Sequence, residues 1–172
     1  MRLKITVLIF ILNFIYGGIH CQTIFKSNKG YTIEIPKGYT KKEGIGKNVD
    51  LKIIDNSGNT IVVVVKKLPA DNEITSAYIL DDMTNEQWEN SLAEGLPNPK
   101  VVKKGKTYLD KKEAFYLHYR TTEYGNARVY YNINYQVILK NTQYVITATC
   151  LNENLTAEMP VFYRMIQSIK FY

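Results

Sequence analysis

The chain has 172 residues, and its 22 Lys and Arg against 16 Asp and Glu give a formal net charge of +6. This length suits one ordinary domain with a hydrophobic core of its own. Two cysteines exclude a fold held together by a disulfide framework, and two histidines leave little material for metal or nucleophilic sites.

Residues 1–21 have the charged and apolar regions of a cleaved secretory signal peptide, in the usual order. Arg2 and Lys4 precede an apolar run over residues 5–19 that ends in a glycine pair. A permanent membrane anchor needs about 20 apolar residues, so cleavage before Gln22 fits the shorter run better. Lipidation of Cys21 is a further alternative, but His20 stands where the lipoprotein peptidase requires a small residue.

Residues 22–172 are therefore expected to form a single exported α+β domain, periplasmic or secreted. Loss of the leader removes two positive charges and lowers the formal net charge from +6 to +4. A nucleic-acid partner is not expected, and a membrane association is expected only if the N-terminus is retained or Cys21 is lipidated. Cys150 is then the only cysteine, and a small buried hydrophobic role suits it. Four Lys-Lys pairs, which begin at 41, 66, 103 and 111, indicate solvated surface.

The first part of the chain predicts strands separated by turns. In residues 31–35 apolar and polar side chains alternate, as in a strand. This predicted strand ends at Pro36-Lys37-Gly38. Residues 49–55 and 60–67 are two more strands around a turn at 56–59. The run from Ile61 to Val65 is apolar on both faces, which places this strand in the middle of a sheet.

A helix is predicted to begin at Thr84. The Thr84 hydroxyl can cap the first turn, Gln87 can reach back to it, and Met83 can pack on Trp88. The apolar face then contains Trp88, Leu92 and Leu96, and Gly95 with Pro97 ends the helix.

The second part predicts a strand meander and a closing helix. The strands cover 101–108, 113–122, 127–140 and 143–150. The helix runs from Thr156 or Pro160 to Ser168, with Pro160 in its first turn. This order of elements predicts an antiparallel sheet with helices on one face.

The chain resembles the PsbP-like α/β/α sandwich domains. The resemblance depends on Gly30-Tyr31-Thr32-Ile33-Glu34-Ile35-Pro36-Lys37-Gly38-Tyr39, the mid-chain helix, the meander and Gln167-Ser168-Ile169-Lys170-Phe171. It implies a domain that binds a protein and lacks an active site, since the family includes a photosystem II subunit, a Ran-binding factor and bacterial envelope proteins. No family motif assigns a functional residue in this sequence.

The residues offer little for catalysis or metal binding. His118 is the only histidine beyond the leader, which excludes sites built on two histidines, and its strand position predicts a polar, surface location. The segment 55–59 resembles a calcium loop but lacks the closing acid, so a hairpin turn explains it. No phosphate loop, CxxC pair or GxSxG motif is present, and no cofactor is expected.

The strand registers predict one polar face. A turn at Asn141-Thr142 would pair Leu139 with Tyr144 and Lys140 with Gln143, which matches core residues with core residues. A three-residue loop at 123–125, with Gly125 in the left-handed region, would place Arg120 opposite Arg128. It would also pair His118 with Tyr130 and Tyr116 with Asn132.

This arrangement suggests a recognition face for another protein or an acidic ligand, because Tyr and Arg dominate binding hot spots. The expected function is a non-catalytic exported binding or accessory protein. Three alternatives stay open: a plain solvated sheet, a purely structural domain, and a small exported hydrolase or transferase that uses Cys150 or His118. The candidate binding residues are Arg120, Arg128, Tyr116, Tyr130, His118 and Asn132.

Overall fold

The computed structural model describes residues 23–70, 76–123, 125 and 127–172. Within them the chain forms a seven-stranded and a three-stranded antiparallel sheet. The predicted signal peptide and its cleavage site lie outside the described residues. The strands are β1 (Thr23–Ser27), β2 (Tyr31–Ile35), β3 (Thr40–Lys42), β4 (Val49–Ile54), β5 (Thr60–Lys67), β6 (Lys100–Leu109), β7 (Lys112–Thr122), β8 (Val129–Leu139), β9 (Thr142–Leu151) and β10 (Lys170–Phe171).

The predicted meander forms one half of the large sheet. The strand order is β3-β4-β5-β9-β8-β7-β6, so β5 is an interior strand between β4 and β9, as its two apolar faces suggest. The small sheet has the order β1-β2-β10 and joins the beginning of the described chain to its end. The order of the large sheet leaves β3 and β6 as its edges, and all the strands that the sequence predicted are present.

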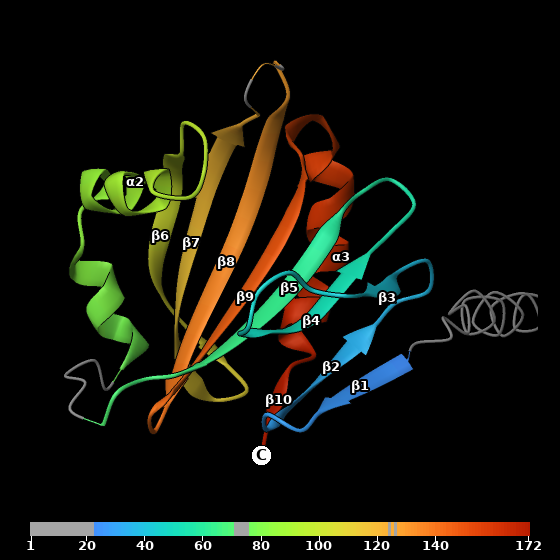
Figure 1. Ribbon diagram of the computed structural model, residues 1–172, viewed down its shortest axis with the longest axis vertical. Coiled ribbons are helices and arrows are strands. Elements are labelled where there is room, and N and C mark those ends of the chain that lie inside the picture. Colours follow the sequence, from blue (N-terminus) through green and yellow to red (C-terminus); the bar gives the residue numbers. More distant parts are fainter. Residues whose placement is uncertain (1–22, 71–75, 124, 126) are drawn as a thin grey trace, which may run out of the picture.

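Helices cover both faces of the large sheet, which corrects the expectation of one covered face. The α-helix α3 (Leu155–Gln167) lies behind the sheet in Figure 1, whereas α2 (Asn85–Ala93) and the 3-10 helix η1 (Ala77–Asp82) lie over β6 and β7 on the other side. The physical reason is that β7 buries side chains on both of its faces. A short 3-10 helix, η2 (Asn152–Asn154), leads into α3.

The main core lies between α3, the small sheet and the large sheet. From α3 it takes Phe162, Met165 and Ile166, which are at most 1% exposed. They pack on the inward side chains of β4, β5, β8 and β9. Burial of this much apolar surface is the main force that holds the layers together. The buried residues facing them include Tyr31, Ile33, Leu51, Ile53, Ile61, Val63, Ile133, Val137, Ile146 and Ala148.

A second core lies under α2 and η1. Trp88 stacks on Phe115 of β7, with 5.3 Å between ring centroids, and its Nε1 donates a hydrogen bond to the Leu80 carbonyl at 3.2 Å. The predicted capping box is confirmed, because Gln87 N donates to Thr84 Oγ1 and Thr84 N donates to Gln87 Oε1. The helix therefore begins where local chemistry requires it to begin.

Helix α3 begins earlier than the position of Pro160 suggested. It starts at Leu155, so Pro160 lies in the second turn rather than the first. Proline has no N–H, and the carbonyl of Thr156 consequently lacks its helical donor. Pro160 is exposed, which leaves water free to reach the helix at this point. No helix among the described residues is long and apolar enough to cross a membrane.

Candidate functional site

The β7–β8 register differs from the predicted one and changes the candidate site. Thr122 pairs with Val129 across a six-residue connection, whereas the prediction paired Thr122 with Asn126. Gly125 is in the left-handed region as expected, with a φ of 76°. A shift of three residues is odd, so it moves each side chain of β8 to the opposite face relative to β7.

The predicted pair of Arg120 and Arg128 is therefore wrong. Arg120 faces Tyr131 across the strands, and its guanidinium lies 6.0 Å from the centre of that ring. Arg128 precedes β8 and is exposed at the end of the sheet. The two arginines do not form one anion-binding fork.

The six candidate residues lie in three places instead of one. Tyr116 and His118 belong to the face that α3 covers, where Tyr116 meets Tyr135 and His118 meets Tyr131 and Tyr163. Tyr130 and Asn132 lie on the opposite face. The predicted platform is thus not a single surface, although Tyr130 and Asn132 do share one.

The β8–β9 register is also shifted, but by two residues. Leu139 pairs with Thr142 and Val137 pairs with Tyr144, because the tight turn consists of Lys140 and Asn141. Lys140 takes a positive φ of 53° in that turn. An even shift leaves each side chain on its predicted face, so the division of β8 and β9 into an apolar and a polar face is confirmed.

His118 is buried rather than exposed. Only 1% of its surface is accessible, and its Nδ1 lies 3.1 Å from the Tyr131 hydroxyl. Burial, with a smaller effect of Lys103, lowers the pKa of His118 from 6.5 to about 4. A ring with this pKa is neutral at physiological pH, and it can accept the tyrosine hydrogen on Nδ1.

Cys150 is a buried hydrophobic residue, as predicted. It is 2% exposed and faces Tyr131 across β8 and β9. Burial, with a contribution from Glu158, raises the pKa of the Cys150 thiol to about 11. A reactive cysteine has a lowered pKa and an accessible sulfur. Cys150 and His118 therefore offer no accessible nucleophile or base, and the hydrolase alternative loses its geometric support.

The segment 55–59 is a hairpin turn between β4 and β5. Asp55 Oδ1 accepts hydrogen bonds from the backbone N–H groups of Ser57 and Asn59, at 2.8 and 2.9 Å. Its Oδ2 accepts one from Asn59 Nδ2 at 2.8 Å. Among the residues that the structure describes, no three His, Cys, Asp or Glu side chains form a group that could hold a metal ion.

The side of the large sheet opposite α3 forms a polar surface that we call the open face. Its centre contains the alternate residues Asn132, Asn134 and Gln136 of β8, each 6 to 7% exposed. In Figure 1 no labelled helix lies in front of β8, β9 and β5. The half-buried side chains around the three amides are Tyr130 on β8, Val145, Thr147 and Thr149 on β9, and Val62 and Val64 on β5.

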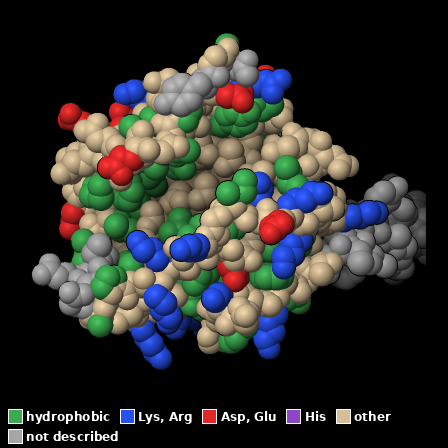
Figure 2. Space-filling model, in the orientation of Figure 1, with side chains coloured by type: hydrophobic (Ala, Val, Ile, Leu, Met, Phe, Trp, Pro, Cys, Tyr) green, Lys and Arg blue, Asp and Glu red, His purple; other side chains and the backbone are tan. Residues whose placement is uncertain are grey.

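The amides of the open face form a ladder of side-chain hydrogen bonds. Thr149 Oγ1 donates to Asn132 Oδ1 at 2.8 Å, and Asn134 Nδ2 donates to Thr147 Oγ1 at 2.9 Å. Gln136 Nε2 then donates to Asn134 Oδ1 at 3.0 Å. Networks of this kind fix side-chain positions and make a rigid surface. Figure 2 shows the middle of this side of the molecule hollowed between raised margins.

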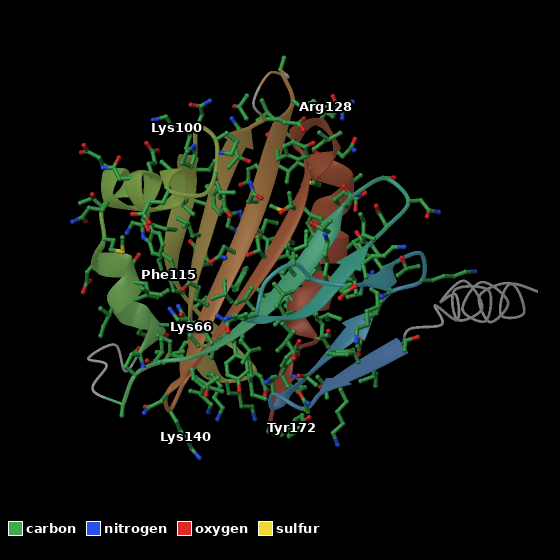
Figure 3. The ribbon with its side chains drawn as sticks, viewed as in Figure 1. Lys66, Lys100, Phe115, Arg128, Lys140 and Tyr172 are labelled. Atoms are coloured by element: carbon green, nitrogen blue, oxygen red, sulfur yellow. The ribbon has the colours of Figure 1, made fainter. Side chains whose placement is uncertain are left out.

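A lysine-lined depression, which we call the lysine hollow, lies where the two sheets meet. It consists of two adjoining cavities of about 330 and 340 Å³ that share Lys29, Val65 and Lys67. Figure 3 shows Lys66 and Tyr172 in the lower half of the molecule, away from Lys100 and Arg128 at the top. The lining includes Lys29, Lys47, Asp50, Lys66, Lys67 and Tyr172.

The sequence pattern did not reveal the lysine hollow. Lys29 lies in the β1–β2 turn, Lys47 in the β3–β4 connection and Lys66 at the end of β5. These lysines come close together only through contacts between the two sheets. In a sequence, a Lys-Lys pair such as Lys66-Lys67 indicates ordinary solvated surface. In Figure 2 the Lys and Arg side chains gather over the lower half of the molecule.

Two further hollows lie away from these surfaces. One, of about 620 Å³, separates β2 from α3 and is lined by Ile24, Glu34, Tyr163 and Arg164 among others. The second, of about 800 Å³, contains Arg128, Ser57 and Asn152 at the end of the sheet where β8 begins. Oδ1 of Asn152 is buried without a hydrogen-bond partner.

Comparison with known proteins shows which family shares this architecture. The family model described as PsbP matches residues 21–171. The solution structure of cyanobacterial PsbP from Synechocystis sp. PCC 6803 has a TM-score of 0.68 and 16% identity, over 90% of this chain and 95% of that one. A search among curated proteins gives no match.

Two other solved structures share the fold at lower identity. LpqN of Mycobacterium tuberculosis, described as involved in cell envelope biogenesis, has a TM-score of 0.55 and 13% identity over 93% of this chain and 95% of that one. The Ran-binding protein Mog1p of Saccharomyces cerevisiae has a TM-score of 0.59 and 7% identity over 87% and 95%. Identities this low establish the shared fold alone.

Proposed function

Because the chain belongs to the PsbP family, we propose that it is a non-catalytic accessory protein, exported from the cell, which binds a partner protein through the open face. The charged start and apolar run of residues 1–21 support export. The burial of Cys150 and His118 supports a role without catalysis.

The relatives support a protein partner. Mog1p is described as a Ran-binding protein and LpqN as involved in cell envelope biogenesis. The same fold therefore occurs in a protein that binds another protein and in one with an envelope role. Fold alone does not fix function, so the proposal depends on a surface of this chain.

The open face is the observation that carries the proposal. Its three central amides are almost fully buried and hydrogen-bonded, Asn132 with Thr149 and Asn134 with Thr147 and Gln136, while the valines and threonines around them stay half-exposed. A partner that covers the face gains apolar contact from Val62, Val64 and Val145. Covering the amides costs the partner little, because their hydrogen-bonding groups are already satisfied within the ladder.

Site-specific photo-crosslinking in the exporting cell tests the proposal. A crosslinker at Val145, on the open face, should yield a discrete adduct with one protein. The same crosslinker at Val102 is the matched control, because Val102 is an exposed valine on the edge strand β6. The adduct at position 145 identifies the partner by mass spectrometry.

A charged substitution then tests whether the open face is required. Val145→Arg should abolish capture of the identified partner, whereas Val102→Arg should retain it. Both substitutions replace a half-exposed or exposed valine, so denaturant unfolding should show folded protein in each case. Equal capture by the two variants, or equal adducts at the two crosslinker positions, would contradict the proposal.

A further inference from the structure

The lysine hollow lies next to a loop with an exposed isoleucine. Ile45 is 89% exposed in the β3–β4 connection, between Gly44 and Gly46, and Lys47 follows two residues later. A single exposed apolar residue is common on protein surfaces and explains nothing alone. Here it stands beside the lysines of the hollow, and a second apolar group, Tyr172, is 66% exposed at its margin.

Hydrogen bonds position the lysines around this loop. The Val65 N–H donates to the Asn48 carbonyl at 2.9 Å. Lys66 and Lys47 are adjacent in sequence to these two bonded residues and are therefore brought together. Lys67 Nζ donates to Thr142 Oγ1 at 2.8 Å, and the Tyr144 hydroxyl donates to the Lys29 carbonyl at 2.9 Å. The positive charges are thus held at one end of the molecule.

The hollow keeps an excess of positive charge. Its lining contains four lysines and one acidic side chain, Asp50, whose Oδ2 accepts hydrogen bonds from the hydroxyls of Ser27 and Tyr31, at 2.5 and 2.8 Å. Within the described residues, Lys29, Lys47 and Lys66 make no ion pair with an acidic side chain. Their ammonium groups are free for an external anion.

The charge of the chain is divided between two regions. Residues 23–67 contain nine lysines and four acidic residues, whereas residues 77–94, which form η1 and α2, contain five acidic residues and no basic one. An anionic plane would therefore attract the first region and repel the second, and so orient the molecule.

We propose that the lysine hollow and Ile45 dock the protein on the surface of an anionic phospholipid bilayer. Lys29, Lys47, Lys66 and Lys67 bind lipid phosphates, and the Ile45 side chain enters the interface between the headgroups and the acyl chains. Tyr172 adds an amphipathic ring of the kind that favours this depth. The interaction requires neither a retained leader nor a lipid on Cys21.

Vesicle co-sedimentation tests the proposal with the processed protein recovered after export. The probes are vesicles of phosphatidylcholine mixed with phosphatidylglycerol, and vesicles of phosphatidylcholine alone. The protein should sediment with the first and stay in solution with the second, and binding should fall as salt rises. Failure to bind the anionic vesicles would overturn the proposal.

Charge variants locate the surface. Each lysine near an anionic bilayer contributes about a five-fold factor in affinity, so K47E/K66E should weaken binding by at least about 25-fold. The matched control is K37E/K103E, which changes the net charge equally at two exposed lysines outside the hollow. An equal loss in both variants would show that only net charge matters and would overturn the site.

The isoleucine distinguishes a bilayer from an acidic protein. Ile45→Ser should weaken vesicle binding by about ten-fold, because the side chain loses its apolar contact with lipid. Unchanged vesicle binding by Ile45→Ser would overturn the insertion of Ile45 and leave a purely electrostatic surface, which would suit an acidic protein equally well. All variants share the same N-terminal segment, so their differences report the hollow and its loop.

Discussion

The Nδ1 atom of His118 lies 3.1 Å from the hydroxyl of Tyr131, inside the layer between the large sheet and α3. This contact joins a titratable ring to the main core, where burial keeps the ring neutral. It also gives the fold a dependence on pH that can be measured.

The stability of the protein should fall in mild acid because of His118. The unfolded chain binds a proton near pH 6.5, whereas the folded chain binds it only near a pKa of about 4. The stabilisation is complete above pH 6.5 and is lost as the pH falls from 6.5 toward 4, by at most roughly 3 kcal/mol. His118→Gln, which can accept the Tyr131 hydrogen without titrating, should unfold with a weaker pH dependence across this window in chemical denaturation. Parallel pH curves for the two proteins would contradict the prediction.

Trp88 should contribute more to stability than the cap of its helix. Trp88→Ala removes the stack on Phe115 and should lower the free energy of unfolding by about 3 to 5 kcal/mol. Thr84→Ala removes one hydrogen bond at an exposed helix end and should lower it by about 1 kcal/mol. Denaturant melts compare the two, and a larger loss for Thr84→Ala would show that the second core contributes little.

Gly105 should be required only while Tyr116 is present. The two residues are direct partners in the β6–β7 pair, and a Cβ on Gly105 would lie 3.0 Å from the Tyr116 hydroxyl oxygen. Gly105→Ala should therefore cost about 1 kcal/mol or more. In a Tyr116→Ala background the same change should be neutral or stabilising, because glycine within a strand costs about 0.5 to 1 kcal/mol. A double-mutant cycle measures the difference, and strict additivity would mean that the contact has no energetic weight.

Pro160→Ala should stabilise the protein. The change restores the N–H that the carbonyl of Thr156 lacks, at an exposed position, and should raise the free energy of unfolding by about 1 to 3 kcal/mol. Pro36→Ala is the matched control, since Pro36 lies in a turn outside any helix and no helical bond is restored there. Equal effects of both substitutions in thermal unfolding would show that the missing helical bond is unimportant.

Local signals predicted the elements of this fold. The capping box requires only Thr84 and Gln87, three residues apart, and the Asp55 turn requires bonds within five residues. Alternation along β8 and β9 separated the apolar face from the amide face correctly. These features depend on chemistry between near neighbours, which the sequence displays directly.

The candidate site depended on a register that the sequence does not fix. β7 buries Phe115, Leu117 and Tyr119 on one face and Ala114 and His118 on the other, so either face can be matched to the core. When both faces are buried, the hydrophobic pattern no longer selects one register. The length of the β7–β8 connection then decides the pairing, and a loop of three residues and one of six are both compatible with a left-handed Gly125. The lysine hollow was missed because its residues come from two separate connections and from the end of β5.

The lysines of the edge strands have a further consequence. β6 carries Lys100, Lys103, Lys104 and Lys106, and β3 carries Lys41 and Lys42. An unpaired strand edge is a template onto which another chain can add and begin to aggregate, and edge lysines oppose this because an incoming strand would bury or confront their charges. Both margins of the seven-stranded sheet are thus protected against polymerisation. A chain that crosses a membrane unfolded and must fold afterwards, without its sheets joining those of its neighbours, would benefit from such protection.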